Sequence, residues 1–181
     1  MDAVRSALDD DAATVRAAAL SELVRSEQMT TADVARAIVD PDQIVRRQIC
    51  ELSTSCPSGD FGTLLHDSEP TVIEAAAFAC GEQEIAAALD SLIEITTTHP
   101  DALCRESAVA ALGVLGLPFG LPAILTALSD VAAVRRRAVI ALANYEAPEV
   151  TAALTKAMTD RDWQVRQAAE DVLGINRTST H

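Results

Sequence analysis

The stretch that decides the fold runs from Ser129 to Leu142 and reads SDVAAVRRRAVIAL. Its second residue is Asp130, which suits a helix N-terminus, because a carboxylate accepts hydrogen bonds from the first free amides and favours the positive end of the helix dipole. Apolar side chains then recur at Val134, Ala138 and Leu142, a spacing of four residues that keeps them on one helical face. The stretch therefore predicts an amphipathic helix that begins shortly after Asp130.

The apolar–Arg pair within this stretch recurs along the whole chain. Its second residue falls at positions 16, 46, 74, 105, 135 and 166, so the spacings are 30, 28, 31, 30 and 31 residues. The third copy is degenerate and has Glu in place of Arg. The six pairs are Val15-Arg16, Val45-Arg46, Ile73-Glu74, Cys104-Arg105, Val134-Arg135 and Val165-Arg166. A period of this length indicates tandem structural repeats.

Each repeat also holds a second apolar segment, such as 121–128 or 150–158, set off by turn residues including Pro and Asp. We therefore expect six helical hairpins. Their predicted spans are 1–27, 28–57, 58–82, 83–116, 117–146 and 147–174. One hairpin cannot bury its apolar face alone, so stacked neighbours share one core. The sequence thus predicts an all-α fold, a right-handed α-solenoid forming a single domain over 1–174, with a flexible tail at 175–181.

Residues 129–142, 159–169 and 101–116 resemble HEAT repeats, and their subtype is similar to the short bacterial HEAT-like repeats of the phycobilin-lyase type. The resemblance implies an arginine ladder, in which the Arg of each pair binds an Asp in the turn of an adjacent repeat. The implied ladder arginines are Arg16, Arg46, Arg105, Arg135 and Arg166, with Asp11, Asp42, Asp101, Asp130 and Asp162 as candidate acceptors. Glu74 would interrupt this ladder, so we expect a looser junction, or hinge, around the third repeat.

Composition narrows the class of partner. The formal net charge is −13, which disfavours phosphate backbones and anionic membrane surfaces. No apolar run reaches the roughly 20 residues of a membrane span, and the N-terminus lacks a signal-peptide pattern, so we expect a cytoplasmic protein with reduced thiols. The four cysteines and three histidines are scattered rather than grouped at zinc-ligand spacing. We therefore expect no metal and no cofactor.

No catalytic motif stands out in the sequence. His99 lies five residues before Cys104, which formally allows a Cys–His nucleophile pair. Cys104, however, occupies the apolar position that Val fills in four other repeats, so the sequence favours burial of its thiol. We expect no enzymatic activity.

The second helix of each repeat is predicted to line the concave side of the solenoid. Residues two, five and six positions after the apolar residue of each pair fall on one face, which mixes apolar and charged side chains. The predicted partner-binding residues are Arg47, Glu51, Phe78, Glu106, Val109, Arg136, Val139 and Ile140. For the two valines, packing between repeats is an equal alternative.

These patterns favour a binding module, an adaptor or scaffold that recognises a protein or peptide segment in its groove and is a monomer on its own. The runner-up is a bilin-lyase-like enzyme or cofactor chaperone, which the subtype resemblance implies. A third interpretation is a nucleic-acid binder acting through Arg135, Arg136 and Arg137, which the overall charge opposes.

Overall fold

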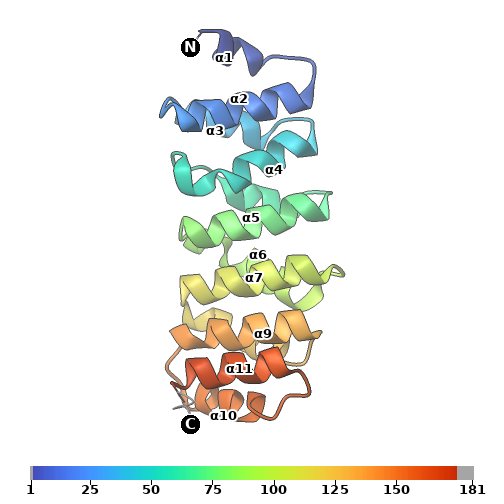
Figure 1. Ribbon diagram of the computed structural model, residues 1–181, viewed down its shortest axis with the longest axis vertical. Coiled ribbons are helices and arrows are strands. Elements are labelled where there is room, and N and C mark those ends of the chain that lie inside the picture. Colours follow the sequence, from blue (N-terminus) through green and yellow to red (C-terminus); the bar gives the residue numbers. More distant parts are fainter. Residues whose placement is uncertain (1, 175–181) are drawn as a thin grey trace, which may run out of the picture. The chain divides into compact units, whose positions relative to one another are not determined.

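The computed structural model describes residues 2–174, which contain helices and turns but no strand (Figure 1). The predicted all-α fold of stacked helical hairpins is confirmed for this part of the chain. The predicted flexible tail lies outside the described residues. Internal contacts divide the chain into two compact units that meet between Ile85 and Ala86. The single domain and the right-handed superhelix remain predictions.

The first unit holds three hairpins. Their second helices are α2 (Ala13–Arg25), α4 (Gln43–Glu51) and α5 (Pro70–Glu82), and α4 packs against both of the others. The first helices of the three hairpins are α1 (Asp2–Ala7), α3 (Thr31–Ile38) and η2 (Phe61–His66). A short 3₁₀ turn, η1 (Ser53–Ser55), follows α4 and precedes the third hairpin. The third hairpin thus begins with a 3₁₀ helix rather than an α-helix.

The second unit holds the other three hairpins. Their second helices are α7 (Ala102–Leu115), α9 (Ala132–Ala141) and α11 (Trp163–Val172), which lie one below the other in Figure 1, with α9 packed between its neighbours. The remaining elements are η3 (Ala86–Ala88), α6 (Leu89–Thr98), η4 (Pro118–Gly120), α8 (Leu121–Ala127), η5 (Leu142–Asn144) and α10 (Pro148–Ala157).

Local sequence signals explain where the helices begin and end. The carboxylates of Asp42, Asp101 and Asp162 accept hydrogen bonds from the first amides of α4, α7 and α11. The start of α3 is fixed by a capping box between Thr30 and Asp33. Gly116 ends α7 with a φ of 59°, a left-handed conformation that glycine adopts without a Cβ penalty.

The third repeat is shifted by one residue from its predicted register. In α4, α7, α9 and α11 the buried apolar residue of the pair lies three positions after the helix N-cap. The N-cap of α5 is Glu69, so the equivalent residue is Val72, which is fully buried. Ile73 therefore occupies the Arg position, and the assignment of Glu74 to it is wrong. Spacing alone could not detect the shift, because Val72 and Ile73 are both apolar.

Candidate functional site

An arginine ladder joins successive repeats within each unit. In the second unit, Nε and Nη2 of Arg135 donate to the Asp160 carboxylate at 2.9 and 2.7 Å, and Nη1 donates to the Asp130 carbonyl at 2.7 Å. Arg105 repeats this geometry, with bonds of 2.6 and 2.7 Å to the Asp130 carboxylate. Each guanidinium thus binds its own turn with one edge and the next repeat with the other.

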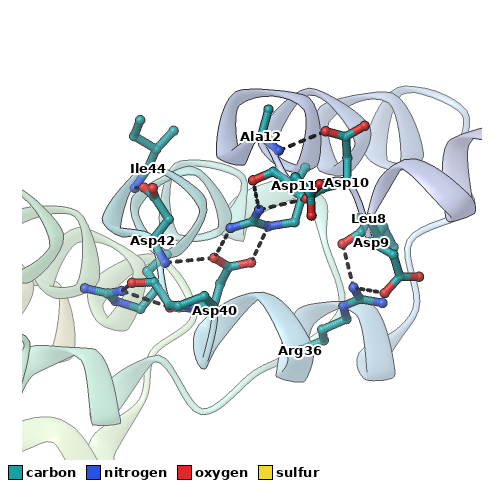
Figure 2. A network of polar contacts seen from close by, with 12 residues as sticks. Leu8, Asp9, Asp10, Asp11, Ala12, Arg36, Asp40, Asp42 and Ile44 are labelled. Carbon is teal, nitrogen blue, oxygen red and sulfur yellow. Dashed lines mark hydrogen bonds and ion pairs between the residues drawn. The ribbon is translucent and has the colours of Figure 1, made fainter.

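The first unit contains two equivalent pairs. Arg16 binds the Asp40 carboxylate at 2.9 and 2.7 Å, and Arg46 binds the Asp67 carboxylate at 2.6 and 2.9 Å. Figure 2 shows the surroundings of Asp40, whose carboxylate also accepts the amide N–H of Asp42. Bidentate Arg–carboxylate bonds fix both distance and angle between neighbouring repeats.

The predicted ladder acceptors need correction. Only Asp130 binds the Arg of another repeat through its carboxylate. The carboxylates of Asp42, Asp101 and Asp162 instead accept amides of the helices that they cap, and Asp11 offers its backbone carbonyl to Arg16 of its own repeat. The true acceptors are Asp40, Asp67, Asp130 and Asp160. Asp40 and Asp160 each lie two residues before the predicted acceptor, Asp42 or Asp162, at the start of the turn that faces the preceding repeat.

The ladder lowers the pKa values of its carboxylates. The bidentate hydrogen bond from Arg105 lowers the pKa of Asp130 below its ordinary value, and partial burial opposes this effect. Arg135 lowers the pKa of Asp160 in the same way. Both pairs are largely shielded from solvent, with side-chain exposures of 6–17%. The ladder residues therefore hold neighbouring repeats together, and their geometry supports the structural role that the family resemblance implies.

The ladder motif is interrupted at two positions. Ile73 stands where the other repeats have Arg, and His99 stands at the start of a turn where they have Asp. The Nδ1 atom of His99 accepts the Asp101 amide at 3.1 Å, as the Asp40 carboxylate accepts that of Asp42 at 2.9 Å. His99 therefore keeps the turn without supplying a carboxylate. Cys104 is fully buried, which argues against a nucleophilic role for its thiol.

Two predicted partner-binding residues are wrong. Val109 and Val139 are both fully buried and belong to the core, so they pack between helices instead of meeting a partner. Of the others, Arg47 and Glu51 are exposed and bind one another along α4, and Phe78 is 48% exposed. Glu106 accepts hydrogen bonds from Arg137 of the next repeat. Their roles in partner binding remain predictions.

The remaining two predicted residues, Arg136 and Ile140, line one groove between α9 and α11. Its volume is about 450 Å³. Trp163 lies at the same groove and is 63% exposed, although sequence reasoning did not select it. It lies directly after the N-cap Asp162 and is the only tryptophan of the sequence, which was the available signal. The groove is completed by Gln164, Gln167, Ala168, Asp171 and Val172.

Two of the other thiols are in positions unfavourable for chemistry. Cys50 and Cys80 are fully buried, and burial raises the pKa of Cys80 to about 12 and raises that of Cys50 further. Within residues 2–174, no three His, Cys, Asp or Glu side chains gather closely enough to hold a metal ion. No helix in this part of the chain has the length and apolarity needed to span a membrane.

Comparisons with known proteins find similar helical-repeat folds. A family model described as HEAT repeats matches residues 121–180. The fold is similar to an engineered protein, with a TM-score of 0.74 at 18% identity over 97% of this chain and 98% of the other. A computationally designed armadillo repeat protein for modular peptide recognition has a TM-score of 0.68 at 17% identity, over 94% and 97% of the two chains. No curated protein matches the sequence.

Stacked hairpins joined by a periodic Arg–Asp ladder define a helical-repeat protein of the α-solenoid class. The family match over residues 121–180 supports a HEAT-type assignment for the last two hairpins of this fold. The phycobilin-lyase subtype remains a resemblance in sequence.

Proposed function

We propose that this protein is a binding module without catalytic activity, which holds a peptide segment of another protein in the groove between α9 and α11. The observation that carries the proposal is Trp163, a large aromatic side chain 63% exposed beside Ile140, which is 39% exposed. Single exposed apolar residues are common, but these two share one concave surface. Tryptophan is also the residue type most enriched among those that dominate binding energy.

The polar rim of the groove supplies orientation. Arg136, Gln167 and Asp171 surround the apolar centre and offer both donors and acceptors. This arrangement of an apolar centre with a polar rim is that of protein-recognition sites. An extended or helical peptide could place one or two apolar side chains in the centre of the groove and hydrogen-bond its backbone amides to the rim.

The solved relatives and the charge narrow the choice of peptide. One similar structure, with a TM-score of 0.64 at 18% identity over 86% of this chain and 84% of the other, is a designed armadillo repeat protein in complex with the peptide (KR)4. The net charge of −13 steers cationic segments toward this chain and repels acidic ones. We therefore propose a basic peptide with an apolar anchor residue as the partner.

Trp163 is the only tryptophan, so its fluorescence reports on this groove directly. A displayed library of basic peptides with one variable apolar position is selected on the full chain, and each selected peptide is titrated against Trp163 emission. We expect saturable spectral shifts with Kd values in the micromolar range, about −8 kcal/mol. Ile140→Ser and Asp171→Lys should weaken binding at least about tenfold, which corresponds to 1.4 kcal/mol. Arg136→Glu should instead strengthen it, because the change replaces a positive charge at the groove with a negative one.

Phe119 provides the matched control, because it is 81% exposed in the same unit but does not line the groove. Phe119→Ser should bind the selected peptides as the unchanged protein does. Equal binding by Ile140→Ser and Phe119→Ser, or selected peptides that leave Trp163 emission unaltered, would place recognition elsewhere and refute the assignment.

A further inference from the structure

The residues that line the groove between α9 and α11 form two rows. On α11, Trp163, Gln167 and Asp171 follow one another at intervals of four residues, which places them on one helical face. At a rise of about 1.5 Å per residue, Trp163 lies about 12 Å from Asp171 along the helix axis. On α9, Arg136 and Ile140 form the second row and lie about 6 Å apart by the same rise.

Equivalent positions in the two repeats set the order along the groove. Because α9 and α11 are the second helices of consecutive hairpins, positions at the same distance from the buried valine of each apolar–Arg pair lie at the same level. Arg136 and Gln167 both come two residues after this valine. Ile140 and Asp171 both come six residues after it, and Trp163 comes two residues before it. The groove thus begins with an aromatic side chain, continues past a cation and ends with a carboxylate beside an aliphatic side chain.

Both charges of the groove are available to a ligand. Arg136 and Asp171 are exposed, and neither forms an ion pair with another residue in the described part of the chain. The adjacent arginine differs, since Arg137 binds the Glu106 carboxylate. The Asp171 carboxylate accepts only the side-chain amide of Gln167, at 2.9 Å, which orients the carboxylate without neutralising it.

We infer, on the basis of the proposed function, that this groove recognises a spaced pattern in an extended peptide. The pattern is an apolar side chain, a neutral or acidic side chain two residues away, and a Lys or Arg four residues away, in either chain direction. An extended chain advances about 3.3 Å per residue and alternate side chains share one face, so the two outer side chains lie about 13 Å apart. This spacing matches the distance of about 12 Å between Trp163 and Asp171.

Each part of the pattern has a partner in the groove. The apolar side chain covers Trp163, and the aliphatic stem of the Lys or Arg packs on Ile140 while its charged group binds Asp171. Arg136 repels a cation at the central position, so a uniformly basic peptide is disfavoured. An extended backbone also leaves its N–H and C=O groups free for the amide side chain of Gln164, whereas a helical peptide has already paired most of them.

Short synthetic peptides of Ser and Gly with one Leu and one Arg test the spacing. Arg is placed two, three, four or eight residues from Leu, in both orders, and each peptide is titrated against Trp163 emission of the full chain. A separation of four should bind at least about tenfold more tightly than a separation of two or three. At this separation, Arg at the central position should weaken binding and Glu should strengthen it, since that position faces Arg136. Tightest binding at eight, the separation that a helical peptide needs, would overturn the extended conformation.

Two charge reversals test whether the preferences arise in the groove. Asp171→Lys should change the preferred residue at the outer position from Arg to Glu, and Arg136→Glu should change that at the central position from Glu to Arg. Arg161→Glu is the matched control, because Arg161 is exposed in the same unit but does not line the groove, and it should leave both preferences unaltered.

The outcomes separate this inference from the proposed function. Equal affinity at every separation, or preferences that both charge reversals leave unchanged, would overturn the inference while peptide binding in the groove still stands. If no peptide alters Trp163 emission, the proposed function itself fails, and the inference fails with it.

Discussion

At the scale of single residues, the ladder shows how one interaction is assembled from two local motifs. Three of the four acceptor Asp residues close their own turn by accepting an amide two residues later, and each carboxylate so fixed also binds the arginine of the preceding repeat. The Asp130 carboxylate does the same with the amide of the very next residue, Val131. The turn therefore restricts the carboxylate before the repeats stack, which lowers the entropic cost of the bidentate bond.

This geometry predicts a specific response to acid. Because Arg105 holds the pKa of Asp130 below the unfolded value of about 3.9, the pair contributes stability above that pH and loses it as the pH falls through the lowered native value. Asp130→Asn lacks the titrating group. We expect the difference in free energy of unfolding between the unchanged chain and this variant to be constant above about pH 5 and to shrink toward pH 2.

Urea unfolding followed by circular dichroism across this pH range measures the difference. Asp11→Asn is the control, because the Asp11 side chain takes no hydrogen bond from the described residues. A difference for Asp130→Asn that stays the same at every pH would mean that the Arg105 contact does not stabilise the native carboxylate.

At the scale of helices, the second unit depends on close approach between α7 and α9. Gly113 of α7 lies against Ala141 of α9, where a Cβ on residue 113 would come within 2.7 Å of the Ala141 Cβ. The end of α7 is also fixed from the next repeat, since the Asn144 side chain donates to the Gly113 carbonyl and the Tyr145 hydroxyl donates to that of Leu112. Small residues here let two backbones meet while their last carbonyls remain satisfied.

Gly113→Ala should therefore destabilise the fold, although alanine by itself favours a helix by about 1 kcal/mol over glycine. The neighbour is a helix backbone, 2.8 Å from the new Cβ to the Ala141 Cα, and cannot move aside without separating the helices. We expect a net loss of about 1–3 kcal/mol in urea unfolding. Adding Ala141→Gly should restore part of it. A variant as stable as the unchanged chain would show that α7 and α9 separate at little cost.

Most of this helical organisation could be predicted from the sequence, for a clear physical reason. Helix periodicity, Asp caps and the 30-residue period are local or repeated signals, and repetition averages out accidents at any one position. The wrong predictions concern features that depend on the identity or position of a single residue. The register of α5 depended on which of two buried neighbours, Val72 and Ile73, lies three positions after the N-cap. The ladder acceptor depended on which of Asp40 and Asp42 faces the preceding repeat. Only the packing of neighbouring hairpins distinguishes these alternatives.

The groove between α9 and α11 was predictable in part for the same reason. Arg136 and Ile140 fall on the outward face by helical spacing, and this placement holds because α9 is regular. Val139 differs from Ile140 by one step around the helix, and that step of about 100° moves it from surface to core. Trp163 escaped prediction because it precedes the repeated positions from which the face was counted.

At the scale of the whole molecule, the charged residues are distributed unevenly along the sequence. Residues 1–85 carry 16 acidic and six basic side chains, whereas residues 86–181 carry 11 and eight. The two compact units therefore differ in net charge, −10 against −3, as well as in contacts. An uninterrupted ladder couples repeats within each unit, and the positions that would continue it hold Ile73 and His99. The hinge expected near the third repeat remains a prediction, with its cause now moved from Glu74 to these two residues.

This interruption predicts two separate cooperative openings. In a linear array, stability is approximately a sum of repeat and junction contributions, so a junction lacking its ion pair is where cooperativity ends. Native-state hydrogen exchange read by mass spectrometry should give one opening free energy for amides of α2 and α4 and a second, different one for α7 and α9.

Ile73→Arg combined with His99→Asp supplies the residue types of every other ladder junction and should bring the two values together. Because the new pair adds a donor and an acceptor in equal number, the net charge of the variant is unchanged, and only the junction differs. One common opening free energy in the unchanged chain, or no convergence in a double variant that folds, would show that the gap in the ladder does not divide the molecule.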